Sequence, residues 1–345
     1  MAAVKVLADV DTGVDDALAL IYVAWAHRTG RAQLLGCGTV AGNCTVEQAT
    51  ANTLRVLELA GLEVPVARGA CRPLAGALRT APEVHGEDGL AGAGVGPLYR
   101  KPSPEHAVDQ ILRLSRQHAG ELVLVATGPL TNVAMALVLE PELARRLARL
   151  VVMGGGVRDL GNVTAAAEFN FYTDPEAAHV VLESGVPLTL VGLDVTHQVY
   201  VEETDLARLQ QVDTPQARFA RHLLRFGMEA YRRLGGPARF YLHDPLAAAV
   251  ALDARWVSGR WVSLSVETRG ERTRGMCVAD WRRQPEAAVP HGPGWAWVAL
   301  QVEGRRFVGH FMEELARWAR GAGADGPAEL AGGRDTRDER AAAHG

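Results

Sequence analysis

The sequence has few lysines, no closely spaced cysteine pair and no long apolar run. Lys5 and Lys101 are the only lysines, and a net charge of −4 over 345 residues leaves no basic surface of the kind that binds nucleic acid. The four cysteines include no Cys-x-x-Cys pair, so the sequence does not indicate a zinc ribbon or a thioredoxin-like site. The apolar runs fall short of the roughly 18 residues of a membrane span, and the N-terminus lacks a signal-peptide pattern. We therefore expect a cytoplasmic protein that binds neither nucleic acid nor membrane.

An acidic stretch stands out instead. Directly after an apolar run, Val4–Ala8, that is typical of a buried strand, four carboxylates fall within eight residues: Asp9, Asp11, Asp15 and Asp16. From Asp15 onward the apolar spacing becomes helical, so the acids lie at a strand–loop–helix corner. Close carboxylates repel one another unless a cation or protons offset their charge. A hard cation, Ca²⁺ or Mg²⁺, is the natural partner of such oxygen atoms.

Three other interpretations explain this stretch less well. An acidic helix start explains Asp15 and Asp16, which favour the first helical turn, but not Asp9 and Asp11 on the strand side. An EF-hand loop would need glycine at Val14 and glutamate at Leu20. A phosphate-binding loop is excluded because no glycine-rich run here ends in Lys-Ser or Lys-Thr.

Apolar patterning predicts an α/β fold. Strands and helices alternate along the first half, with predicted strands over Val4–Ala8, Leu34–Val40, Val64–Ala67, Glu121–Ala126, Leu150–Met153 and Leu188–Leu193. The second half is more helical and adds predicted strands over Trp256–Val266 and Ala296–Val302. This rhythm predicts a single open, mainly parallel, Rossmann-like β-sheet flanked by helices, with small extra helices and strands.

The domain organisation is predicted from composition. Residues 1–320 form one expected domain because no linker divides them. Residues 321–345 lack apolar periodicity, and we expect this C-terminal tail to be disordered. Residues 68–102 are rich in glycine, proline and alanine and predict a long loop that closes as a lid.

Polar residues gather where predicted strands end, which is where ligands bind to parallel sheets. Asn43, Thr127 and Asp194 join the acidic stretch at such ends. Further along, Asn162, Glu168 and Asn170 supply amides and a carboxylate that suit hydroxyl recognition, although each alone is as often a loop cap. His243 and Asp244, and His85 in the predicted lid, are candidates of the same kind: alone, each is more often structural.

Together these pieces closely resemble the calcium-dependent nucleoside hydrolases, the inosine-uridine-preferring group and its relatives. The resemblance covers about Val4 to Arg320. Its motifs are Asp9-Val-Asp-Thr-Gly-Val-Asp-Asp16, Val40-Ala-Gly-Asn43, Ala126-Thr-Gly-Pro-Leu-Thr-Asn132, Gly161-Asn-Val-Thr-Ala-Ala-Ala-Glu-Phe-Asn170, Gly192-Leu-Asp-Val-Thr-His197 and His243-Asp-Pro245.

The resemblance implies hydrolysis of the N-glycosidic bond of ribonucleosides with a Ca²⁺ cofactor. It implies Ca²⁺ ligands at Asp11, Asp16, Asp244 and the Thr127 carbonyl, with Asp9 behind them holding a neighbouring ligand. Asp11 is implied as the base that activates water, and His243 as the group that assists the departing base. The implied substrate-binding residues are Asp15, Asn43, His85, Met153, Asn162, Glu168, Phe169, Asn170 and Tyr231.

The base pocket departs from the family pattern. Gly227 stands where some members place an aromatic residue, while Tyr231 falls where some place another. We expect a pyrimidine-leaning or broad base preference. Two alternatives remain: a hydrolase of a modified or other ribosyl substrate, and a Ca²⁺-dependent nucleoside-binding protein without turnover. The resemblance also implies a homodimer or homotetramer.

Overall fold

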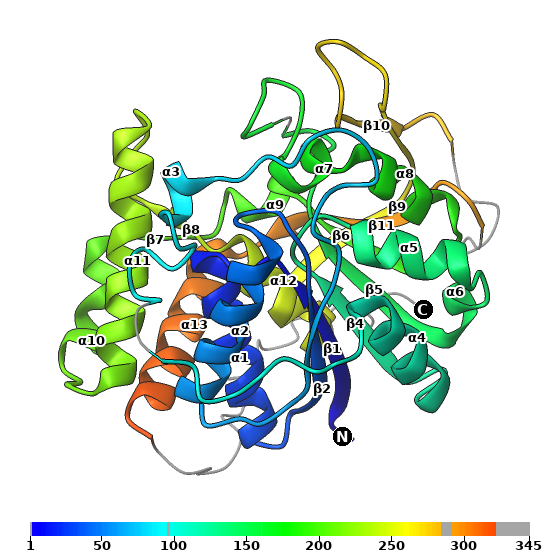
Figure 1. The fold of residues 1–345 in the computed structure, drawn as a ribbon. Helices are drawn as coiled ribbons and strands as arrows, with labels where there is room; N and C mark the ends of the chain where they lie inside the picture. The colour runs from blue at the N-terminus through cyan, green and yellow to red at the C-terminus, as the bar shows by residue number, and fades with distance from the viewer. Residues whose placement is uncertain (1, 95–96, 160, 284–291, 322–345) are drawn as a thin grey trace, which may run out of the picture.

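The computed structural model describes residues 2–94, 97–159, 161–283 and 292–321. A nine-stranded sheet runs through it in the order β10-β9-β11-β6-β5-β4-β1-β2-β3 (Figure 1). Its strands are β1 (Val4–Val10), β2 (Ala32–Thr39), β3 (Val66–Arg68), β4 (Leu122–Ala126), β5 (Leu147–Met153), β6 (Leu188–Val191), β9 (Val257–Val266), β10 (Cys277–Asp280) and β11 (Trp295–Val302). Neighbouring strands from β3 to β11 are parallel, and β9 and β10 extend that edge in antiparallel pairs. The predicted open, mainly parallel sheet is confirmed.

Helices cover both faces of the sheet (Figure 1). One side carries α1 (Val14–Arg28), α2 (Val46–Leu59), α12 (His243–Leu252) and α13 (Gly304–Ala319). The other side carries α4 (Ala107–Gln117), α5 (Thr131–Leu139), α6 (Leu143–Arg146) and α8 (Pro175–Glu183). The long helix α11 (Pro215–Arg233) stands apart from these two sets. Smaller elements complete the fold: α3 (Pro82–His85), α7 (Phe169–Thr173), α9 (Leu193–Thr196), α10 (Ala207–Gln210), η1 (Glu203–Leu206), η2 (Ala254–Trp256) and the paired strands β7 (Tyr200–Val201) and β8 (Phe240–Tyr241).

The central strands are apolar without interruption because each buries both of its faces. In β1, Val6 and Ala8 belong to the core beneath α1 and α12, whereas Leu7 belongs to the core beneath α4 and α5. In β4, Val125 and Leu124 divide between the same two cores. The strand period of two therefore sends alternate side chains into two separate apolar layers.

The strand order reverses beside β1, and this reversal places the site. From β1 the chain moves outward to β2 and β3, and later strands build on the opposite side, beginning with β4. The carboxyl ends of β1 and β4 therefore border a crevice that no crossover helix covers. The acidic stretch follows β1, and Thr127 follows β4.

Some local predictions need correction. The predicted long loop contains α3, a helix too short to show a 3.6-residue period. The predicted strand Leu188–Leu193 ends at Val191, because Gly192 turns the chain into α9. Strand β10 was not predicted. The expected tail disorder falls outside the described residues, and the single domain over 1–320 stays a prediction. Within the described ranges, no helix is both long and apolar enough to cross a membrane.

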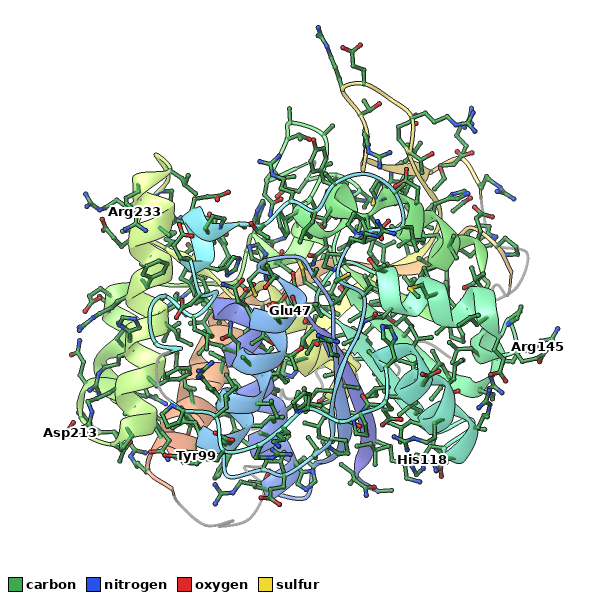
Figure 2. The ribbon with its side chains drawn as sticks, viewed as in Figure 1. Glu47, Tyr99, His118, Arg145, Asp213 and Arg233 are labelled. Atoms are coloured by element: carbon green, nitrogen blue, oxygen red, sulfur yellow. The ribbon has the colours of Figure 1, made fainter. Side chains whose placement is uncertain are left out.

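Side chains in Figure 2 show how charge is kept at the surface. Asp213 and Arg233 lie near opposite ends of α11, and Arg145 projects from the far side of the molecule at α6 (Figure 2). Tyr99, which is 85% exposed, also lies on the outside (Figure 2). By contrast, all four carboxylates of the acidic stretch are buried, as are those of Glu168 and Asp244.

Candidate active site

A single cleft collects the residues that the sequence singled out. It encloses about 260 Å³, slightly below the roughly 300–1,000 Å³ typical of small-molecule sites. Every predicted substrate-binding residue lines it: Asp15, Asn43, His85, Met153, Asn162, Glu168, Phe169, Asn170 and Tyr231. Thr127, His243 and Asp244 line it as well. Asp9, Asp11 and Asp16 do not line the cleft and are almost completely buried.

The acidic corner is a tight turn between β1 and α1. Gly13 precedes the first residue of α1, and its backbone N–H donates to Asp16 Oδ2 at 3.0 Å. A Cβ at position 13 would lie 2.5 Å from His85 Nδ1 and 2.8 Å from Asn43 Nδ2. Only glycine therefore lets His85 and Asn43 approach the carboxylates this closely.

Asn43 and Thr127 hold two of the buried carboxylates. The Asn43 backbone N–H donates to Asp11 Oδ2 at 2.6 Å, and its side-chain amide donates to Asp16 Oδ2 at 3.0 Å. The Thr127 hydroxyl donates to Asp16 Oδ1 at 2.7 Å. Within the described residues, Asp11 Oδ1 and Asp15 Oδ1 are buried and have no hydrogen-bond partner. These two oxygens are free to bind something else.

The carboxylates form a donor set that fits a metal ion. Asp15, Asp16 and Asp244 each offer an oxygen, and these atoms lie within 4.8 Å of one another. Burial raises the pKa of Asp15 to about 7, and burial followed by the charge of Asp16 raises the pKa of Asp11 well above 3.8. Burial, then the charges of Asp15 and Asp16, does the same to the pKa of Asp244. Such clustered, buried oxygens with unused lone pairs need a cation or bound protons to offset their charge, and they could hold a metal ion.

Asp9 lies behind this set. Its Oδ1 accepts from Asn132 Nδ2 at 2.8 Å, and the same amide nitrogen donates to the Thr39 carbonyl at 2.9 Å. The Asp9 backbone carbonyl accepts from the Thr127 backbone N–H at 3.0 Å. The Asp9 side chain therefore holds Asn132, and its link to the predicted ligand Thr127 runs through the backbone. Burial raises the pKa of Asp9 to about 7.

Opposite the acids, α7 begins with a buried carboxylate. Glu168 Oε1 accepts from the Asn170 backbone N–H, and Oε2 accepts from the N–H groups of Gly155 and Phe171 at 2.8 and 3.1 Å. The side chain thus caps α7 and ties it to the glycine turn after β5. Burial raises the pKa of Glu168 to about 7. Asn162 Oδ1 accepts from the Phe169 backbone N–H at 3.0 Å, so both predicted hydroxyl-binding groups also cap the loop.

Asn170 connects this wall to the carboxyl ends of β4 and β5. Its side-chain amide donates to the Thr127 carbonyl at 2.7 Å and to the Met153 carbonyl at 3.2 Å. Because a carbonyl oxygen has two lone pairs, Thr127 keeps one for another partner.

His85 closes the cleft from α3. Its Nδ1 accepts from the Val14 backbone N–H at 3.1 Å, at the start of α1, and lies 3.9 Å from Asp15 Oδ1. Burial lowers the pKa of His85 to about 4, so the ring is neutral at pH 7 with its proton on Nε2. Behind it, Asn52 Nδ2 donates both to the Thr12 carbonyl and to the Asp88 carbonyl, joining the acidic corner to the loop after α3.

His243 lines the same cleft and lies between two hydroxyls. Its Nδ1 is 2.8 Å from Thr196 Oγ1, and its Nε2 is 3.2 Å from the Tyr231 hydroxyl. Burial, then the neighbouring His197 and His85, lowers the pKa of His243 to about 3. Sequence reasoning did not predict Thr196, although it belongs to one of the motifs quoted above. Nor did it predict Arg79 or Phe240, which also line the cleft.

The comparisons with known proteins agree with this geometry. Residues 6–309 match the family described as inosine-uridine preferring nucleoside hydrolase. The chain belongs to the nucleoside hydrolase family. The inosine-uridine preferring nucleoside hydrolase of Crithidia fasciculata is 37% identical over 317 residues, which cover 91% of this chain and 98% of that protein.

Two further relatives show the range of the family. The pyrimidine-specific ribonucleoside hydrolase RihA of Salmonella typhimurium is 39% identical over 329 residues, covering 92% of this chain and 100% of that protein. The solved structure of a purine-preferring ribonucleoside hydrolase from Gardnerella vaginalis superposes with a TM-score of 0.83 at 33% identity, covering 92% of this chain and 100% of that one. Nucleoside hydrolases with different base preferences are thus similar to this chain over most of its length.

Proposed function

We propose that this nucleoside hydrolase cleaves the N-glycosidic bond of ribonucleosides to give free base and ribose. The observation that carries the proposal is the single cleft, whose lining brings hydroxyl-binding groups together with the unpaired Asp15 Oδ1. Asp11, which also has an unpaired oxygen, is hydrogen-bonded to Asn43 in that lining. Breaking this bond builds positive charge on the sugar ring, as in other glycoside hydrolysis. Carboxylates around the ribose stabilise that charge.

Calcium is the proposed cofactor. The ligands we propose are the carboxylates of Asp11, Asp16 and Asp244 and the Thr127 carbonyl, an all-oxygen set of the kind that Ca²⁺ prefers. Support comes from the unpaired Asp11 Oδ1 and from the oxygen cluster that includes Asp16 and Asp244. When bound, the ion would supply a positive charge that holds ribose hydroxyls and lowers the pKa of water.

Asp11 is the proposed general base. Its Oδ2 is held by the Asn43 backbone N–H, which fixes the carboxylate and leaves Oδ1 unpaired. Oδ1 then accepts a proton from the attacking water as the water oxygen approaches the sugar carbon. Because Asp11 is completely buried, bulk water does not compete for this oxygen.

The ribose is proposed to lie between the two walls. Asp15, whose Oδ1 is unpaired, and Asn170 bind the 2′- and 3′-hydroxyls. Asn162 and Glu168 bind the 5′-hydroxyl, using lone pairs that their capping bonds leave over. Asn43 and Met153 line the sugar site.

The base is proposed to occupy the end formed by His85, Phe169, Tyr231 and His243. Gly227 shapes this end indirectly: a Cβ there would lie 2.2 Å from the Phe240 ring, so Phe240 fills the space above it. An aromatic residue at position 227 would displace Phe240. We therefore propose a pyrimidine-leaning or broad base preference.

Release of free base from uridine and inosine tests the proposal. Each substrate is incubated with Ca²⁺, after exhaustive chelation, and after Ca²⁺ is restored. Activity that chelation abolishes and Ca²⁺ restores is expected. No release from either nucleoside by folded, calcium-loaded protein would refute the proposal and favour a modified ribosyl substrate or binding without turnover.

The same assay measures base preference. A kcat/KM for inosine at least about ten times that for uridine, a difference of roughly 1.4 kcal/mol, would contradict the proposed preference. The Gly227→Tyr variant is a sharper probe, because it should displace Phe240 and change the ratio of the two kcat/KM values.

We also propose that the chain acts as a homodimer or homotetramer in the cytoplasm, on the family resemblance alone. Sedimentation equilibrium measures the assembly, and a monomer at micromolar concentration would contradict it.

A further inference from the structure

Thr196 is buried beside the cleft, where its side chain contacts His243. It ends α9, the short helix that follows the turn at Gly192, and its side chain is 0% exposed. Its hydroxyl oxygen lies 2.8 Å from His243 Nδ1. Within the described part of the chain, this is the only hydrogen bond that the Thr196 side chain makes.

This isolation decides which way the hydrogen bond runs. A buried hydroxyl proton without an acceptor is costly, and His243 Nδ1 is the one acceptor within reach of Thr196 among the described residues. The Thr196 hydroxyl therefore donates, and Nδ1 accepts. A neutral imidazole that accepts at Nδ1 carries its proton on Nε2.

The tautomer of His243 in turn fixes the donor and the acceptor in its hydrogen bond with Tyr231. His243 Nε2 carries the proton and lies 3.2 Å from the Tyr231 hydroxyl oxygen, so the tyrosine oxygen accepts. Edge-to-face contacts with Tyr241 at 5.1 Å and Phe240 at 6.5 Å fix the Tyr231 ring. The Tyr231 proton is left to point into the cleft that this residue lines.

We infer that Thr196 is a positioning residue for departure of the base. It holds His243 in the tautomer that turns the Tyr231 hydroxyl into a donor toward the leaving nitrogen. When the glycosidic bond breaks, its electron pair stays on the base, and a hydrogen bond from Tyr231 stabilises that negative charge. Tyr231 keeps its proton in this step, and the released base takes one from water. The inference rests on the proposed N-glycosidic hydrolysis.

The test compares leaving groups. Uridine and inosine release a base that needs a hydrogen bond, whereas 4-nitrophenyl β-ribofuranoside releases a phenolate that is stable without one. The Thr196→Val variant keeps the shape and removes the hydroxyl. We expect its kcat for uridine to fall at least about tenfold and its kcat for the nitrophenyl riboside to stay within about twofold of wild type. The Thr196→Ser variant, which restores a hydroxyl, should recover uridine turnover.

A second variant covers the case in which Thr196→Val does not fold. Tyr231→Phe removes the hydroxyl at the end of the chain of hydrogen bonds, and its loss on uridine should exceed its loss on the nitrophenyl riboside by about tenfold or more. In the double variant the uridine loss should be no larger than in Tyr231→Phe, because both changes break one chain.

Two results would overturn the inference. Equal losses on both substrate types in Thr196→Val or in Tyr231→Phe would mean that these hydroxyls serve structure alone. Unchanged uridine turnover in Thr196→Val would mean that the tautomer does not matter. Failure of the proposed function looks different, since wild-type protein would then release no base from uridine or inosine at all.

Discussion

At the scale of single residues, Asn43 bridges two buried carboxylates from one position. Its side-chain amide bonds Asp16, and its backbone N–H bonds Asp11. The Asn43→Ala variant removes only the amide, so Asp16 loses a donor that orients it. We expect the calcium affinity to fall by about 10- to 100-fold while the fold persists. Calorimetric titration of the metal-free protein measures this, with Asn162→Ala as a control that touches no carboxylate of the acidic corner.

Glu168 links stability to pH. Its pKa is about 7 in the folded protein against an ordinary value of 4.5, because burial penalises the charge. Folding therefore takes up a proton between these two values, and stability is lost as the pH rises through that window. The loss is on the order of 3 kcal/mol. Urea unfolding from pH 4 to 8 should show this slope in wild type and a flatter one in Glu168→Gln. Parallel slopes would contradict the assignment.

The sequence could place the acids and amides of the site because they follow strand ends. It could not pair them. Asp9 meets Asn132, and Thr196 meets His243, only because different strands end at the same edge of the sheet. The free oxygens of Asp11 and Asp15 were likewise not predictable, since each depends on which neighbours reach the other oxygen atoms.

At the scale of elements, α13 offers a direct test of helix stability. Gly309 lies on its exposed side, and a Cβ there would have no atom within 4 Å. Alanine restricts the unfolded chain more than glycine does, so Gly309→Ala should raise the free energy of unfolding by about 0.5–1 kcal/mol.

The matched control is Gly304 at the start of the same helix. A Cβ at this position would lie 2.0 Å from the Gln198 carbonyl oxygen, so Gly304→Ala should destabilise the protein. Midpoints of urea unfolding that shift in opposite directions for the two variants would confirm the prediction. Stabilisation by both substitutions would show that backbone freedom alone governs both positions, and destabilisation by both would contradict the gain expected at Gly309.

Some elements carry boundary signals of their own in the sequence. Helix α11 begins with Thr214, whose hydroxyl accepts from the Ala217 backbone N–H, and with Pro215 at the first helical position. Helix α3 has weaker sequence signals, because four residues are too few to show a helical period. Its position depends on the hydrogen bond between His85 and the Val14 backbone N–H. Strand β10 is similar, since it exists only by pairing with β9.

At the scale of the whole molecule, calcium is expected to contribute to stability. Burial, followed by the charges of neighbouring carboxylates, raises the pKa values of Asp11 and Asp244, so removal of a bound cation leaves buried carboxylates that repel one another. Calcium at about 1,000 times its Kd should stabilise the fold by about 4 kcal/mol. A thermal unfolding midpoint that chelator lowers and excess Ca²⁺ restores is the expected result. An equal gain from Mg²⁺ would contradict selectivity for calcium.

The sequence predicted the class of sheet but not the order of its strands. Alternating strands and helices indicate a parallel sheet, but they do not say that β1 lies between β2 and β4. That placement brings Thr127 beside an acidic stretch more than 100 residues earlier, through the hydrogen bond to Asp16.

Asn52 couples the acidic corner to the loop that follows α3. One amide nitrogen holds both the Thr12 carbonyl, inside the acidic corner, and the Asp88 carbonyl, in the loop behind His85. An ion that orders the acidic corner would also order the loop through Asn52. Thermodynamic reciprocity then requires that a nucleoside which orders the loop raises the affinity of the corner for the ion. Cofactor and substrate would then protect each other from dilution.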